Sequence, residues 1–378
     1  MNQALIDLPL LQPLVADRTG FDIGWDHAHH GLVPPAELLH AGSPVCQGWT
    51  AGKAVFGRRT MQSRRTTRQW LALRLQAWRE GAVFDGQLVT ANYLGQLHNE
   101  RCPVLRTALG GAAGHDDAAV VERIDPEAGF VAGNLVVVSA RAASVRQGLT
   151  VQQAVRQARQ AEHTGHHVAG LDAAAWWRLA ALGAFATPLP FADAARLPLA
   201  LLPPNRVRVL GDAQGLQSLV TQFFATAGWS SRCAALARLL PEHTLRHDFN
   251  LFVGAMAPRV LESAPEAAGR RLALEDAWLH ERVLRRWQHL LLSLGEAGVR
   301  TLLAGVAEER LPGLRVLQHV VLHAPEAPGL QRPVARRRAD TARGPVLKRL
   351  SSKPGAATAG PASRPGTVPP PAAPATHA

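Results

Sequence analysis

Apolar residues recur at helical spacing along most of the second half of the chain. The clearest run lies between residues 273 and 295, at Leu274, Trp278, Val283, Leu284, Trp287 and Leu291. Intervals of three to four residues place side chains on one face of an α-helix. Shorter runs predict further helices at 172–183, 212–228, 231–240, 244–256 and 296–309. We therefore expect residues 168–331 to form a helical domain, whose tryptophans lie in a core or on a surface that binds a protein partner.

The first half of the chain predicts fewer helices. Leu71, Leu75 and Trp78 follow helical spacing within residues 63–81, where Ser63 is the expected N-cap and Gly81 the expected stop. A second helical stretch covers 88–100. A third helix is expected over 151–162, because Thr150 and Gln153 have the spacing of a capping box.

Glycine and proline interrupt residues 1–57 repeatedly, so this segment is expected to be irregular. It contains Asp26, His27, His29 and His30, whose side chains are of metal-binding types. Histidines at these spacings need further ligands to hold one ion. We interpret the group as part of a packed or solvated loop.

Two valine-rich runs, 120–124 and 135–139, flank a glycine-containing turn and predict a β-hairpin. Asp125 begins the turn, and Gly133 is expected to adopt a positive φ. A short helix of small residues follows at 140–147. The predicted fold class is α+β and mostly α-helical, with a small ββα finger inside a domain covering 58–165.

The 378-residue chain is basic and 47% apolar, which suits two or three folded domains. Its net charge is +12, and almost all of its cations are arginines. Arginine binds two phosphate oxygens at once through its planar guanidinium group. A GC-rich genome also produces arginine-rich proteins, so the bias alone does not identify a partner.

Basic residues concentrate in two places. Residues 332–378 carry nine basic residues and one acid, are rich in Pro and Ala, and are predicted to be a disordered tail that binds polyanions. Its candidate nucleic-acid contacts are Arg336, Arg337 and Arg338. The second group surrounds the start of the helix at 63–81 and comprises Arg58, Arg59, Arg64, Arg65 and Arg68. Arg79 extends this basic edge along the helix. Such an edge suits binding to a phosphate backbone. The alternative interpretation is a solvated surface that binds no partner.

The three cysteines are far apart, so we expect neither a disulfide framework nor a four-cysteine zinc site. The first residues lack the pattern of a signal peptide. The most apolar window, 171–192, contains charges and prolines, which favours a buried helix over a membrane span. We expect a cytoplasmic protein with no membrane partner.

The run ERIDPEAGFVAGNLVVVSARAASVR, which follows Cys102-Pro103-Val104, resembles HNH-type endonucleases, which have a ββα metal finger. The resemblance covers residues 102–147 of the chain. It implies a nucleic-acid partner, most simply DNA, and a divalent ion such as Mg²⁺ that stabilises the scissile phosphate.

This run departs from the family pattern where the pattern places its catalytic residues. Glu122-Arg123 stands in place of Asp-His, and Ala143 stands where the helix supplies a further ligand. Glu122 still suits a metal, whereas Arg123 stays protonated and suits a phosphate instead of acting as a base. Asn134, which braces the loop in the family, is present. The expected site is therefore Glu122, Arg123 and Asn134, with His115 as a substitute base.

Three functions remain open on these residues. The first is a nucleic-acid-binding protein whose HNH-like finger has weak or no catalysis. The second is a metal-dependent endonuclease that uses an unusual base. The third is a non-enzymatic scaffold whose helical half binds protein.

Overall fold

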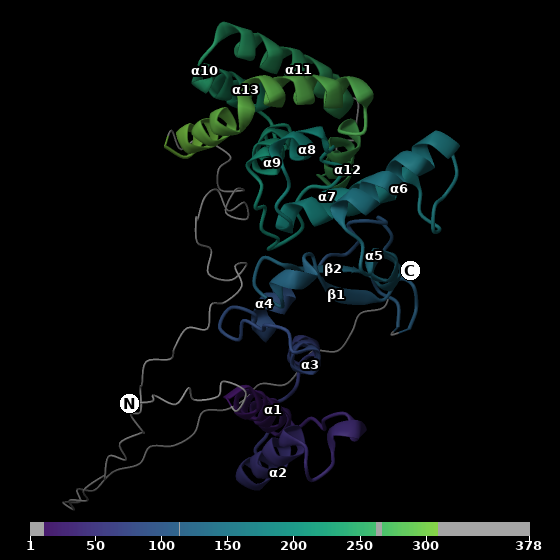
Figure 1. Ribbon diagram of the computed structural model, residues 1–378, viewed down its shortest axis with the longest axis vertical. Helices are drawn as coiled ribbons and strands as arrows, with labels where there is room; N and C mark the ends of the chain where they lie inside the picture. Colours follow the sequence, from purple (N-terminus) through teal and green to yellow (C-terminus); the bar gives the residue numbers. More distant parts are fainter. Residues whose placement is uncertain (1–10, 113, 262–266, 309–378) are drawn as a thin grey trace, which may run out of the picture. The chain divides into compact units, whose positions relative to one another are not determined.

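Helices form most of the structure, and a two-stranded hairpin followed by a short helix lies among them (Figure 1). The computed structural model describes residues 11–112, 114–261 and 267–308. The basic tail predicted at 332–378, with Arg336, Arg337 and Arg338, lies outside the described residues.

The α-helices are α1 (Leu11–His29), α2 (Pro44–Phe56), α3 (Arg65–Glu80), α4 (Ala91–Gln96), α5 (Ala140–Arg146), α6 (Val151–Thr164), α7 (Ala173–Ala186), α8 (Phe191–Arg196), α9 (Asp212–Phe223), α10 (Trp229–Leu239), α11 (His243–Leu261), α12 (Ala267–Ala277) and α13 (Glu281–Glu308).

The hairpin has the strands that the valine-rich runs predict. Strand β1 (Ala119–Arg123) pairs antiparallel with β2 (Leu135–Ser139), so that Ala119 lies opposite Ser139 and Arg123 opposite Leu135. Helix α5 begins directly after β2, where the Ser139 hydroxyl accepts a hydrogen bond from the Ala142 amide. The expected α+β, mostly helical fold class with a ββα unit is confirmed.

The hairpin lies between two apolar clusters. Val136 and Val138 belong to a large core that also includes residues of α5, α6, α7 and the later helices. Leu135 and Val137, on the opposite face of β2, pack with α3 and α4 in a smaller cluster. All five β2 residues are therefore buried. The larger core includes residues on both sides of the boundary expected near residue 168.

The helical half buries its aromatic residues. Trp278 and Trp287 have no exposed surface and pack against Phe252, with ring centroids 5.4 and 5.0 Å from it. Trp176 and Trp177 in α7 are also buried. These four tryptophans therefore belong to the core and not to an interaction surface. The apolar window at 171–192 is a buried helix, as expected.

Helix boundaries differ from the sequence predictions at several places. Helix α4 has six residues, fewer than the stretch 88–100 predicted. The expected helix 273–295 is interrupted between α12 and α13. Gly295 has non-helical angles inside α13, at the predicted break between two helices. Residues 207–211 form neither a helix nor a strand, and α9 begins at Asp212.

The prediction that residues 1–57 are irregular is wrong, because α1 and α2 form a closely packed helical pair. Three glycines of this segment, Gly24, Gly48 and Gly52, occupy the contact between the two helices. A Cβ atom at Gly24 would collide with the Val45 carbonyl oxygen, and one at Gly48 with that of Phe21. Glycine is required there for the close approach of two backbones, and this requirement outweighs its poor helix propensity.

By length and composition, α13 is the one helix among the described residues that meets the criterion for a membrane span. A helix in the core of a water-soluble fold meets the same criterion. In this structure α13 buries one face, which includes Val283, Trp287, Leu291 and Leu303.

Candidate nucleic-acid interface

The turn between the two strands is held by Asn134, as the sequence predicts. The Asn134 side chain is completely buried. Its amide nitrogen donates to the carbonyls of Asp125 (2.7 Å) and Gly129 (2.8 Å), and its oxygen accepts from the Asp125 amide (2.8 Å). One side chain thus satisfies three backbone groups of the loop, which fixes the loop's shape.

Gly133 forms the bend before β2, and its φ of 95° confirms the predicted positive value. Its amide donates to the Tyr93 hydroxyl (2.8 Å), and its carbonyl accepts from the Arg208 amide (3.0 Å). A Cβ atom at this position would collide with the Arg208 side chain. The bend therefore needs glycine for its φ and for its close neighbours.

Glu122 and Arg123 lie on opposite faces of the hairpin. Successive residues of a strand alternate between faces. Glu122 lies opposite Val136 and shares its face, whereas Arg123 lies opposite Leu135, on the side of α3. The two residues that replace Asp-His therefore do not converge on one phosphate group.

Arg123 makes its contacts within the fold, whereas we expected its side chain to bind a phosphate. Its guanidinium group forms an ion pair with Glu80 at the end of α3 (2.8 Å) and donates to the Pro126 carbonyl (3.1 Å). It also lies over the Phe130 ring, 4.5 Å from the centroid. Arg123 thus joins the finger loop to α3.

Arg146 of α5 lies on the Glu122 face of the hairpin. Its guanidinium group donates to the carbonyls of Arg123 and Ile124 at the end of β1. Burial raises the pKa of Glu122, and the Arg146 and Arg123 guanidiniums partly offset this rise. A cation therefore lies beside the carboxylate that was expected to bind a metal ion.

The residues present do not fit a divalent metal ion. His115 is exposed and lies before the start of β1, whereas Glu122 lies near the end of that strand, so the predicted substitute base is at the opposite end of the hairpin. Among the described residues, no three His, Cys, Asp or Glu side chains gather closely enough to hold a metal. The guanidinium of Arg146 beside Glu122 disfavours a magnesium ion there, because the two cations repel each other. The expectation that Glu122 binds Mg²⁺ is not supported.

The histidines near the N-terminus also form no metal site. His27 lies inside α1, where its Nδ1 lies 2.8 Å from the Ile23 carbonyl oxygen, and its pKa is lowered by burial. Asp26 forms an ion pair with Arg74 of α3, and His29 stacks on Phe56 with ring centroids 4.4 Å apart. The side chains of Asp26 and His29 contact other helices. Both residues and His27 lie in α1, and not in the packed or solvated loop that the sequence suggested.

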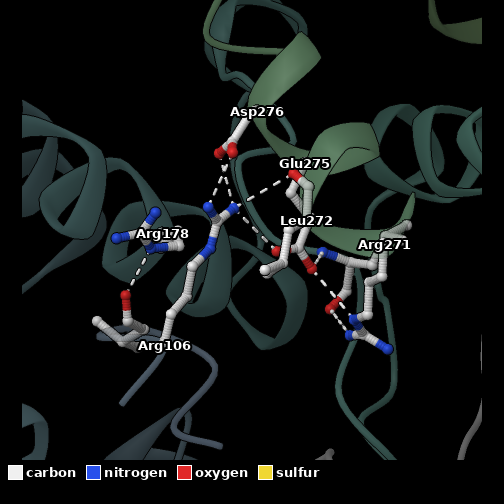
Figure 2. Close-up of polar contacts among 8 residues, drawn as sticks. Arg106, Arg178, Arg271, Leu272, Glu275 and Asp276 are labelled. Carbon is white, nitrogen blue, oxygen red and sulfur yellow. Dashed lines mark hydrogen bonds and ion pairs between the residues drawn. The ribbon is translucent and has the colours of Figure 1, made fainter. Parts of the chain in front are cut away.

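A cluster of ion pairs around the buried Glu275 carboxylate joins the finger to the helical half (Figure 2). Arg106, which follows Cys102 in a tight turn, pairs with Asp276 (2.7 Å) and with the buried carboxylate of Glu275 (3.2 Å) on α12. Glu275 also pairs with Arg271 (3.2 Å) and accepts from the Leu202 amide (3.1 Å). No spacing in the sequence links residues 106 and 275, so sequence reasoning missed this cluster.

The five arginines near the start of α3 differ from those of the finger. Arg58, Arg59, Arg64, Arg65 and Arg68 are all exposed. Apart from Arg68 Nε, which donates to the Ser63 hydroxyl (3.3 Å), their side chains make no hydrogen bond or ion pair with another described residue. The prediction of Ser63 as the N-cap is wrong, because α3 begins at Arg65 and Arg64 occupies the N-cap position, where its side chain caps no amide.

Arg79 does not belong to this free group, although the sequence placed it on the same basic edge. It lies in the last turn of α3 and forms an ion pair with Glu37. Of the arginines that the sequence placed on this basic edge, those without an acidic partner among the described residues are therefore the five at residues 58–68, before and within the first turn of α3.

Comparison of the chain with protein-family models, curated proteins and solved structures found no match. The resemblance to HNH-type endonucleases therefore depends on residues 102–147 of the sequence.

Proposed function

We propose that this protein binds nucleic acid through the arginines at residues 58–68, and that its ββα finger supports the fold without cutting the bound strand. The observation that carries this proposal is that five exposed arginines gather within eleven residues and have no acidic partner in the described part of the chain. Unpaired arginines favour phosphate, because binding releases the counterions that surround a nucleic acid.

The contacts of the charged residues in the finger support the proposal that it does not cut the bound strand. Arg123 binds Glu80 and Arg146 binds backbone carbonyls, and among the described residues Glu122 belongs to no group of three His, Cys, Asp or Glu side chains that could hold a metal. Hydrolysis of a phosphodiester needs a base or an activated water near the phosphorus. His115, the expected substitute base, lies before the start of β1, at the opposite end of the hairpin from Glu122.

The proposal is tested with the full-length protein and a fluorescent 20-base-pair DNA duplex. We expect fluorescence anisotropy to report binding that weakens as salt rises, and supercoiled plasmid to remain uncut in Mg²⁺ or Mn²⁺. Plasmid nicking that Glu122→Ala abolishes would show an active endonuclease instead. Failure to bind DNA or RNA at low salt would overturn the proposal and favour the protein scaffold.

A further inference from the structure

A groove at the start of α3 brings two of the free arginines together with polar side chains of α4. Its volume is about 920 Å³. Arg64 and Arg65 line it, and its other polar lining residues include Asn92 and Gln96 of α4 with His30 and Gln62. None of the residues that line the groove is acidic.

We propose that this groove is the nucleic-acid contact itself and that it holds the sugar-phosphate backbone, with Arg64 and Arg65 on the phosphates. This inference rests on the proposed function and gives it a location. The two guanidinium groups have no other partner among the described residues. Ligand binding would satisfy their donors at no cost of breaking an internal ion pair.

Backbone and polar groups of the groove add to the fit for an anion. The first turn of α3 contains no acid, and its N-cap residue, Arg64, satisfies no amide through its side chain. His30 Nδ1 is enclosed and has no hydrogen-bond partner. The amides of Asn92 and Gln96 donate and accept hydrogen bonds, which suits phosphate and sugar oxygens.

The lining also distinguishes between kinds of nucleic-acid contact. Proteins that hold unpaired bases stack them on aromatic side chains. No Phe, Tyr or Trp lines this groove. The contact is therefore with the backbone, and sequence-independent binding to duplex DNA is expected.

Two sets of variants of the full-length protein test the groove, with the 20-base-pair duplex as the probe. Arg64→Glu/Arg65→Glu reverses its charge and is expected to weaken binding at least about tenfold. The matched control is Arg238→Glu/Arg282→Glu, which makes the same change in net charge at exposed residues of α10 and α13. The control is expected to weaken binding by a much smaller factor.

The second set fills the groove without changing its charge. Gly95 lines the groove on α4, and a Cβ atom there meets only Thr66 Cγ2, at 3.7 Å. Gly95→Trp is expected to weaken DNA binding, whereas Gly95→Ala retains it. The melting temperatures of both variants check that the fold is intact.

The outcomes separate this inference from the proposed function. If the wild-type protein binds DNA and both Arg64→Glu/Arg65→Glu and Gly95→Trp bind like their controls, the groove is not the site, although the protein still binds nucleic acid. If the wild-type protein binds phosphatidylserine vesicles but not DNA, and Arg64→Glu/Arg65→Glu loses the vesicles, the groove serves a membrane surface and both proposals fail.

Discussion

The arginines of the finger and those near the start of α3 are the same residue type in opposite circumstances. Arg123 and Arg146 donate to Glu80 and to backbone carbonyls, and both stabilise the loop of the finger. Arg64 and Arg65 are exposed and lack such partners among the described residues. A basic residue is therefore a candidate for binding when its donors are free, and not because of its place in a family pattern.

The largest effect is expected from Arg146, whose guanidinium group is partly buried against the end of β1. Arg146→Ala leaves the carbonyls of Arg123 and Ile124 without a donor and removes the cation beside Glu122. Loss of one partner from a buried charged contact costs about 3 kcal/mol or more. Urea unfolding measures this loss. Arg156→Ala, at an exposed position on α6, is the control and should change the free energy of unfolding by less than about 0.5 kcal/mol.

The finger loop should also tolerate change poorly at its bend. Gly133→Val forces a β-branched residue to a φ of 95° and into the Arg208 side chain, so we expect a loss of about 3 kcal/mol. Gly148→Val is the matched control, because Gly148 also has a positive φ but no neighbour within 4 Å of an added Cβ. Equal melting temperatures for the two variants would show that the packing against Arg208 is unimportant.

The ion pair between Arg123 and Glu80 should contribute less, because both side chains are partly exposed. We expect Arg123→Ala to reduce the free energy of unfolding by about 1 kcal/mol. A double-mutant cycle with Glu80→Ala isolates the pair. A loss of DNA affinity in Arg123→Ala without a loss of stability would contradict its structural role and restore the phosphate contact that the sequence suggested.

The smallest expected effect is the contribution of Glu122 to the pH dependence of the free energy of unfolding. Burial raises its pKa in the folded protein, so between the usual glutamate pKa and the raised value the folded state holds a proton that the unfolded chain has released. The free energy of unfolding therefore falls as pH rises through that window. Glu122→Gln should remove this fall, be more stable than the wild type above the window and equal it below. A variant that is less stable than the wild type at neutral pH would mean that the Glu122 carboxylate is held ionised by Arg146.

Much of the fold could be predicted where local chemistry decides the structure. The capping box of Thr150 and Gln153, the αL stop at Gly81 and the brace at Asn134 all follow from short-range hydrogen bonds or backbone freedom. The α1–α2 pair could not be predicted, because its glycines have meaning only when two helices meet.

The candidate site was predictable only in part for the same reason. The sequence identified the arginines at 58–68, but it did not show which arginines would form ion pairs or hydrogen bonds within the fold. That depends on distant partners such as Glu80 for Arg123 and Glu275 for Arg106. The groove likewise needs α3 and α4 to be placed side by side, which residue spacing does not reveal.

The salt dependence of DNA binding would show whether Arg64 and Arg65 contact phosphates, because its slope counts phosphate contacts. Anisotropy titrations of the full-length protein between low and moderate salt would compare wild type, Arg64→Ala/Arg65→Ala and Arg123→Ala. We predict that the slope of log Kd against log salt falls by about 0.9 for each phosphate contact removed, hence by about 1.8 for the double variant, and stays unchanged for Arg123→Ala. An unchanged slope in the double variant together with a reduced slope in Arg123→Ala would place the contact at the finger and contradict the account.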